Sequence, residues 1–186
     1  EFAPLPLQES YDNAGLQVGY RDSRVNAVML CLDVTQDVLD EAIKRKCDMI
    51  VSHHPLIFQG LKHLTGRSET ERIVIKALQA GVAIYSAHTN LDSTWNGVSH
   101  EMAHMLDLHD IEVLSPIEGN PQAGLGVIGN ITPTPKLELL RRIKEKFGVK
   151  SLRYSTQSSA IVAKRIAMCG GSGAGFIKRA IEMGAD

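Results

Sequence analysis

The chain has 186 residues, of which 44% are hydrophobic, so it can bury a core in one domain or in two small ones. Its formal net charge of −1 gives no electrostatic argument for binding nucleic acid or an anionic membrane surface. No apolar run reaches the length of a spanning helix, and no signal peptide is recognisable. The three cysteines, Cys31, Cys47 and Cys169, are widely spaced without a CxxC pair. This pattern favours reduced thiols and a cytoplasmic protein.

The first half of the chain alternates predicted strands and helices. Residues 26–34 form an almost unbroken apolar run, which is typical of a strand buried on both faces. Thr35 is a suitable N-cap, and Gly81 is a suitable helix terminator. We then predict three helices, over 35–46, 68–80 and 97–107. Two strands are predicted between them, over 49–53 and 82–86. This order predicts a mainly parallel sheet with helices on both faces.

Residues 115–122 contain two prolines and one glycine and are interpreted as a linker. It would separate a first α/β lobe, residues 1–115, from a second, residues 123–186. Alternatively, the later elements continue the same sheet. We predict three strands in this part, over 126–131, 151–155 and 165–169. Two helices are predicted, over 135–147 and 174–183. The predicted fold class is α/β, with mainly parallel sheets flanked by helices.

Polar residues follow two neighbouring predicted strands. Ser52-His53-His54-Pro55 ends one, and His88-Thr89-Asn90-Leu91-Asp92 ends the next. Ligands of open α/β sheets bind at the carboxyl ends of the strands. Imidazoles and a carboxylate at that edge indicate a divalent-metal site. Adjacent residues of an extended chain point to opposite sides, so His53 and His54 are predicted to serve two metals in one cleft.

Each candidate also has an ordinary structural interpretation. The histidine pair could be hydrogen-bonded at the surface of a strand end, Asp92 could be a turn or capping carboxylate, and Asp33 could cap the next helix. Asn13 and Gln17, in a glycine-punctuated segment interpreted as a turn, could supply amides to a ligand.

Two further motifs resemble known functional signatures. His100-Glu101-Met102-Ala103-His104 matches HExxH, but the helical period is expected to bury Met102 and Met105 and to leave His100 and His104 facing solvent. We interpret it as a chance match. The run 170–175 is rich in glycine and is either a tight strand-to-helix turn or an anion-binding loop.

Four segments together resemble, in order and spacing, the Nif-three-like family, whose members are often called GTP cyclohydrolase I type two homologues. They are residues 11–19, 51–58, 87–92 and 124–129. The last is the weakest, because family members usually carry Arg where Val127 stands. The resemblance extends over the whole chain and matches the short form without a PII-like insertion.

The resemblance implies two similar lobes facing a metal cleft, a dinuclear divalent-metal site and a ring-shaped homohexamer. His54 and Asp92 would bind one metal and His53 the other, while His88 would lie in the cleft. The family completes its site with a His and a Glu near the C-terminus, and this sequence ends before that motif, so we expect the C-terminal part to be missing.

The implied function is that of a metal-dependent hydrolase of the cyclohydrolase type, which opens a C–N bond of a nucleotide or a small cyclic amide. His88 is the candidate catalytic acid and base, because imidazole transfers protons near neutral pH. The mixed ligands suit Zn, Fe, Mn or Ni. One alternative is a non-enzymatic metal-binding regulator or metal-handling scaffold. Another is a zinc peptidase that uses His100 and His104.

Overall fold

The computed structural model describes residues 2–155 and 162–186. The chain divides into two compact units, Glu1–Leu91 and Asp92–Asp186, each with its own sheet. Helices flank both sheets, and the predicted α/β fold class is confirmed. The division falls before the segment 115–122, for which the sequence predicts a linker.

The first unit has a four-stranded sheet in the order β1-β4-β3-β2. Strands β2, β3 and β4 are mutually parallel neighbours, and β1 pairs with β4 in the antiparallel direction. The elements of this unit, with α3 reaching one residue beyond it, are η1 (Leu5–Leu7), β1 (Gly15–Val18), β2 (Val28–Cys31), α1 (Gln36–Lys44), β3 (Met49–Ser52), α2 (Glu69–Ala80), β4 (Ala83–Ser86) and α3 (Thr89–Asp92).

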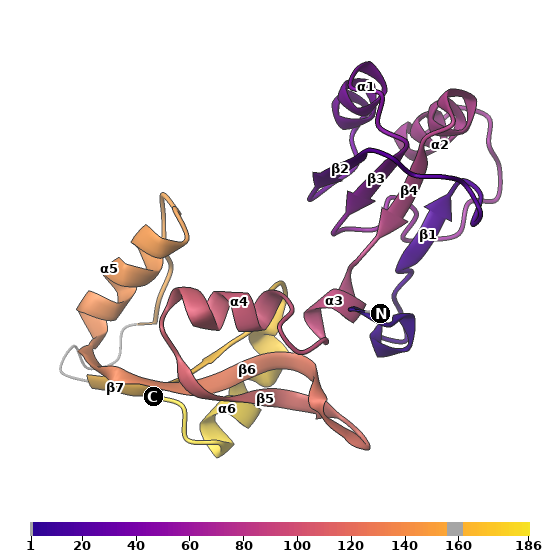
Figure 1. Ribbon diagram of the computed structural model, residues 1–186. Coiled ribbons are helices and arrows are strands. Elements are labelled where there is room, and N and C mark those ends of the chain that lie inside the picture. Colours follow the sequence, from indigo (N-terminus) through magenta and orange to yellow (C-terminus); the bar gives the residue numbers. More distant parts are fainter. Residues whose placement is uncertain (1, 156–161) are drawn as a thin grey trace. The chain divides into compact units, whose positions relative to one another are not determined.

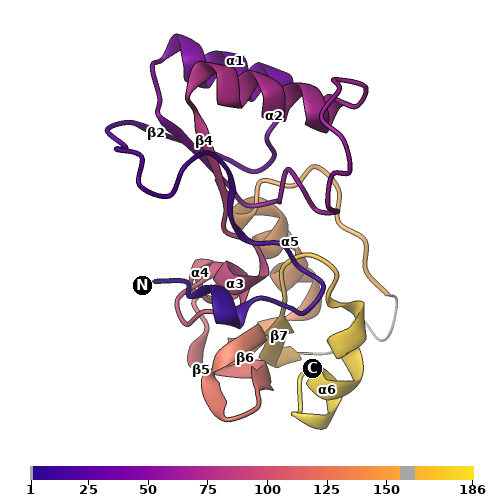
Figure 2. The same cartoon turned by 90° about the vertical axis from the view of Figure 1, so that its right-hand side faces the viewer.

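Both long helices of the first unit cover the same face of its sheet. Strands β2, β3 and β4 follow one another in a single direction across the sheet. Right-handed crossovers between them therefore place α1 and α2 on one side, where the two helices lie side by side (Figure 1, Figure 2). The expectation of helices on both faces is wrong for this sheet. Accordingly, β2 buries one side only, and Leu30 on its other side is 77% exposed.

Local signals explain where these elements begin and end. Thr35 Oγ1 accepts a hydrogen bond from Val38 N at the start of α1. Gly81 adopts the left-handed conformation that ends α2. Strand β1, predicted as a turn, lies so close to β4 that a Cβ at Gly19 would be 2.9 Å from Ala83 Cβ. Gly19, directly after the strand, therefore has no room for a side chain, although in the sequence it suggests a turn.

The second unit has an antiparallel sheet in the order β5-β6-β7. Its elements are α4 (Val98–Met105), β5 (His109–Ile117), β6 (Asn120–Pro135), α5 (Lys136–Lys146), β7 (Val162–Met168), η2 (Gly173–Phe176) and α6 (Ile177–Glu182). Strands β5 and β6 are not parallel because only two residues, Glu118 and Gly119, connect them. A two-residue connection makes a hairpin, whereas a parallel pair needs a long crossover. The segment interpreted as a linker is this hairpin.

Three further features of the described residues bear on the predictions. Residues 151–155, where a strand is predicted, have no regular secondary structure. None of the described helices is both long and apolar enough to span a membrane. The three cysteines are half-buried and form no disulfide.

Candidate metal centre

The site begins where two parallel strands of the first sheet end together. Ser52 of β3 is paired with Ser86 of β4, so the residues that follow both strands emerge at the same edge. His53 N donates to Cys31 O at 3.2 Å, and His54 N donates to Leu32 O at 2.9 Å. The end of β2 therefore holds the backbone of the histidine pair.

Two buried serines hold the carbonyl groups of the same pair. Ser86 Oγ donates to His53 O at 2.9 Å, and Ser52 Oγ donates to His54 O at 2.8 Å. Both serines are almost completely buried. The two carbonyl oxygens lie beyond the last paired residues of the strands, so the serine hydroxyls supply their hydrogen-bond donors. A buried carbonyl group without a donor would cost about 1–3 kcal/mol of stability.

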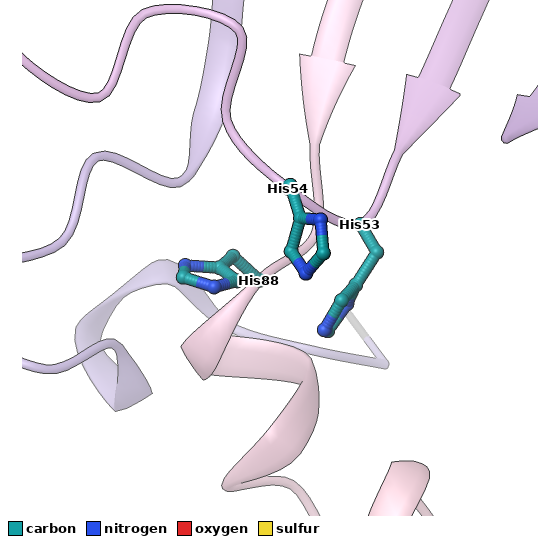
Figure 3. A group of neighbouring side chains, drawn as sticks. All are labelled: His53, His54 and His88. Atoms are coloured by element: carbon teal, nitrogen blue, oxygen red, sulfur yellow. The ribbon is translucent and has the colours of Figure 1, made fainter. Parts of the chain in front are cut away.

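Three histidine rings converge at this edge, as Figure 3 shows. His53, His54 and His88 each offer one ring nitrogen, and these atoms lie within 4.8 Å of one another. The ring centroids of His53 and His54 are 5.1 Å apart. The expectation that the two rings point to opposite sides is wrong, because β3 ends at Ser52 and the alternation of an extended strand no longer applies.

Each of the three rings is held at its Nδ1 atom by a different acceptor. The contacts are His53 Nδ1 with Ala87 O at 2.9 Å, His54 Nδ1 with Asp33 Oδ1 at 2.7 Å, and His88 Nδ1 with Asp12 Oδ1 at 2.8 Å. A carbonyl or an ionised carboxylate can only accept, so the neutral rings carry their proton on Nδ1. Nε2 is then the nitrogen that each ring can offer to a metal.

This arrangement fits a divalent metal ion. Metal-binding histidines characteristically donate the other ring nitrogen to a carboxylate or a backbone carbonyl, which fixes the ring and raises its basicity. All three rings show this pattern. Neutral imidazoles suit Zn, Fe, Ni or Cu. The donor set alone therefore supports a metal site without identifying the metal.

The other predicted site residues have distinct places. Asp33, interpreted as a helix cap, instead contacts His54. His88 directly precedes α3, and Asn90 Oδ1 accepts a hydrogen bond from His88 N at 3.0 Å. Asp92 is the last residue of α3 and the first of the second unit. Within residues 2–155 and 162–186, the group of converging ligand atoms comprises the three histidines without Asp92.

Asn13 and Gln17 fasten the loop that follows the histidine pair. Asn13 Nδ2 donates to Ile57 O at 2.6 Å, and Gln17 Oε1 accepts from Ile57 N at 3.0 Å. The Phe58 ring in the same loop lies edge-on to His88, with centroids 6.4 Å apart. The two amides thus hold the protein's own loop beside the histidines.

The HExxH helix is not built as a metal site. His100 is only 3% exposed and packs against the Trp95 ring, whereas His104 is exposed. The prediction that both face solvent is therefore wrong for His100. The buried face of α4 consists of Ser99, His100 and Ala103. The buried side of α4 was predicted from the spacing of hydrophobic residues, and the polar residues Ser99 and His100 on that side do not follow this spacing.

Asp12, whose carboxylate contacts both His88 and Thr89, was not predicted as a site residue. Its neighbours in sequence suggest only a turn. Thr89 lies 77 positions further along the chain, and no periodic pattern of the sequence signals a contact over that distance. Ser52 and Ser86 were also missed, although each occupies the last position of its strand.

The chain is similar to known proteins over its whole length. A family model described as Duf34/NIF3 (NGG1p interacting factor 3) matches residues 1–186. The chain is 36% identical over 188 residues to a Clostridium acetobutylicum protein named GTP cyclohydrolase 1 type 2 homolog, covering 100% of this chain and 70% of that protein. A Lactococcus lactis protein of the same name is 36% identical over 188 residues, with 100% and 71% covered.

Solved structures resemble the whole chain. A Staphylococcus aureus hypothetical protein matches with a TM-score of 0.90 and 29% identity, covering 100% of this chain and 73% of that one. A Bacillus cereus protein related to NIF3 has a TM-score of 0.89 at 23% identity, covering 100% and 78%, and shows the shared fold alone.

Proposed function

Because the chain belongs to the Duf34/NIF3 family, we propose that it binds divalent metal at its cluster of converging histidines and uses this site to hydrolyse a C–N bond. The observation that carries the proposal is the Nδ1 anchoring of all three rings, which leaves their Nε2 atoms for metal binding and for proton transfer. The relatives' name supports a cyclic amidine or amide in a nucleotide as the substrate class.

His53 and His54 are the proposed metal ligands, and Asp92 is the carboxylate that the family resemblance adds to them. The same resemblance supports two ions rather than one. A bound divalent ion would lower the pKa of a coordinated water and polarise the bond under attack. Carboxylate and imidazole together accept Zn, Fe, Mn or Ni.

His88 is the proposed acid and base of the reaction. Its Nδ1 is held by Asp12, so its Nε2 can take a proton from water and return it to a leaving nitrogen. An imidazole does this near neutral pH. The ring is partly accessible, with a side-chain exposure of 18%, as a proton carrier requires.

A cavity of about 220 Å³ beside His54 supports binding of a small polar group. Asp33, Thr35, Glu69 and Thr70 contribute polar side chains to its lining. It is smaller than the pockets that enclose whole drug-sized ligands, so it would hold one part of the substrate. Assembly as a homohexamer and a cytoplasmic location complete the proposal and rest on the family resemblance and the cysteine pattern.

The first experiment measures metal per chain by elemental analysis, on protein purified without chelator or metal-affinity resin. We expect metal in the wild type and its loss in His54→Ala, since the half-exposed His54 side chain contributes little to the core. His104→Ala is the matched control, because His104 is exposed and lies on the HExxH helix. Metal absent from the wild type, or retained in His54→Ala, would contradict the proposed site.

A second experiment separates catalysis from metal handling. The metal-loaded protein is tested for turnover across nucleotides and cyclic amides, with Asp92→Asn as the comparison. Turnover that disappears in the variant supports the hydrolase. Full metal occupancy without turnover on any substrate would favour the non-enzymatic metal-binding scaffold.

A further inference from the structure

The Asp12 carboxylate is completely buried beside the histidine cluster. Its side chain has an exposed fraction of 0%. Oδ1 accepts from His88 Nδ1 at 2.8 Å and from Asn13 N at 2.7 Å. Oδ2 accepts from Thr89 N at 3.0 Å and also from Thr89 Oγ1. The two oxygens therefore engage two consecutive residues at the start of α3.

These contacts keep Asp12 ionised at neutral pH. Oδ1 and Oδ2 each accept a hydrogen bond from a backbone amide, Asn13 N and Thr89 N, and such hydrogen bonds favour the charged form of a carboxyl group. An ionised carboxylate has no proton to donate, so the shared proton resides on His88 Nδ1. His88 Nε2 then carries a lone pair.

We propose that Asp12 is a positioning residue of the site, which holds His88 in the Nδ1–H form and presents its Nε2 toward His53 and His54. The inference rests on the proposed function only in assigning a use to that lone pair. Whether Nε2 accepts a proton from water or binds a metal, it must be unprotonated and correctly aimed.

The contact with His88 is not needed to fasten the N-terminal segment. Thr89 Oγ1 also accepts from Glu9 N at 2.9 Å, and Asn90 Nδ2 donates to Ala3 O at 2.9 Å. These bonds join the segment to α3 independently of the imidazole. A purely structural anchor could therefore do without the bond to His88, whereas a positioning residue could not.

The decisive experiment determines the His88 tautomer in metal-free protein at pH 8 by long-range ¹H–¹⁵N NMR. We expect Nδ1–H in the wild type and a shift toward Nε2–H in Asp12→Asn, because the amide can turn its NH₂ group toward the ring. An unchanged tautomer in Asp12→Asn, or Nε2–H in the wild type, would overturn the proposal.

Two variants separate positioning from general loss of structure. Thr89→Val removes one bond to Asp12 and one to Glu9 but leaves the carboxylate on His88. Asp48→Asn alters a carboxylate that accepts from Asn26 N and Ala27 N, at the start of β2 and away from the histidines. Both are expected to keep the wild-type tautomer, even where stability falls. A shift in either of them equal to that in Asp12→Asn would assign the effect to unfolding and overturn the proposal.

Metal affinity supplies the second measurement. Zn²⁺ titration against a chromophoric chelator is expected to leave the affinity of Asp12→Asn close to that of the wild type, because His53 and His54 are the proposed ligands and Asp12 contacts His88. A loss of about 10- to 100-fold, the usual effect of removing a partner of a metal-binding histidine, would assign His88 Nε2 to the metal instead of to proton transfer. If the wild type binds no Zn²⁺ while Asp12→Asn shows the tautomer shift, the metal site is refuted and positioning by Asp12 is supported. If the wild type binds Zn²⁺ while Asp12→Asn shows no tautomer shift, the metal site is supported and positioning by Asp12 is refuted.

Discussion

The two units differ in how some of their buried polar side chains are hydrogen-bonded. In the first, Ser52, Ser86, Thr89 and Asn90 are buried, and each is hydrogen-bonded at the edge where the histidines converge. In the second, Ser93 Oγ and His100 Nε2 are buried without a hydrogen-bond partner among the described residues. The buried polar groups of the first unit build a site, whereas these two of the second do not take part in a network.

Sheet topology accounts for this contrast. Parallel strands end at one edge, so residues that follow β2, β3 and β4 are brought together even though they are far apart in sequence. Antiparallel strands joined by a hairpin send successive ends to opposite edges. A site that needs several neighbouring strand ends is therefore favoured in the first unit.

The largest expected effect tests the hairpin of the second unit. A Cβ at Gly124, where φ is +149°, would lie 2.7 Å from Pro116 Cα and closer still to Ser115 O. Gly124→Ala should lower the free energy of unfolding by about 3 kcal/mol, from overpacking and backbone strain. Chemical denaturation measures this. Gly81→Ala, at φ +69° but with open space around the new Cβ, should cost only about 1–2 kcal/mol; equal losses would show that crowding against β5 is unimportant.

The next prediction compares two serines that are equally buried. Ser86 is 0% exposed and donates to His53 O, whereas Ser93 is 1% exposed and its Oγ has no described partner. Ser86→Ala should cost about 1–2 kcal/mol, because a buried carbonyl loses its donor. Ser93→Ala should be nearly neutral. Urea denaturation of both variants measures the difference, and a larger loss in Ser93→Ala would reverse the contrast between the units.

The smallest expected effect concerns His100 and its response to pH. Burial, with a contribution from His104, lowers the pKa of His100 below its ordinary value of 6.5, despite the opposing influence of Glu101. The unfolded state therefore binds the proton more readily, and the stability that this histidine contributes above pH 6.5 is lost as the pH falls through its folded pKa.

His100→Phe should remove that part of the acid sensitivity and raise stability at pH 7 by about 1 kcal/mol, since an unsatisfied buried nitrogen disappears. Denaturation curves between pH 5 and pH 8 compare the variant with the wild type. If both lose stability equally below pH 6.5, other groups carry the pH dependence.

Much of the first unit is predictable from the sequence because its signals are local. The N-cap at Thr35 and the terminator at Gly81 bound two helices, and the strand ends identify His53, His54 and His88. The resemblance to the Nif-three-like family, stated from the motifs, is confirmed over the whole chain. Asp92 remains a predicted ligand.

What the sequence did not reveal depends on contacts between distant residues. Asp12 reaches His88 across 76 positions, and no pattern of the intervening residues indicates that contact. The rings of His53 and His54 converge because the strand ends one residue earlier than the alternation assumes. Pro116 and Gly119 indicate a break in regular structure, but they do not distinguish an interdomain linker from a hairpin turn.

The position of the histidines beyond the last paired residues of β3 and β4 has a consequence for engineering. His53 and His54 contribute no side chains to the hydrophobic core that α1 and α2 form with the sheet, while the buried serines beneath them fix the backbone. Ligand chemistry and folding are therefore separable at this edge. In the proposed metal site, exchanging His54 for cysteine or aspartate would redirect the choice of metal toward softer or harder ions while the sheet that carries the site stays intact.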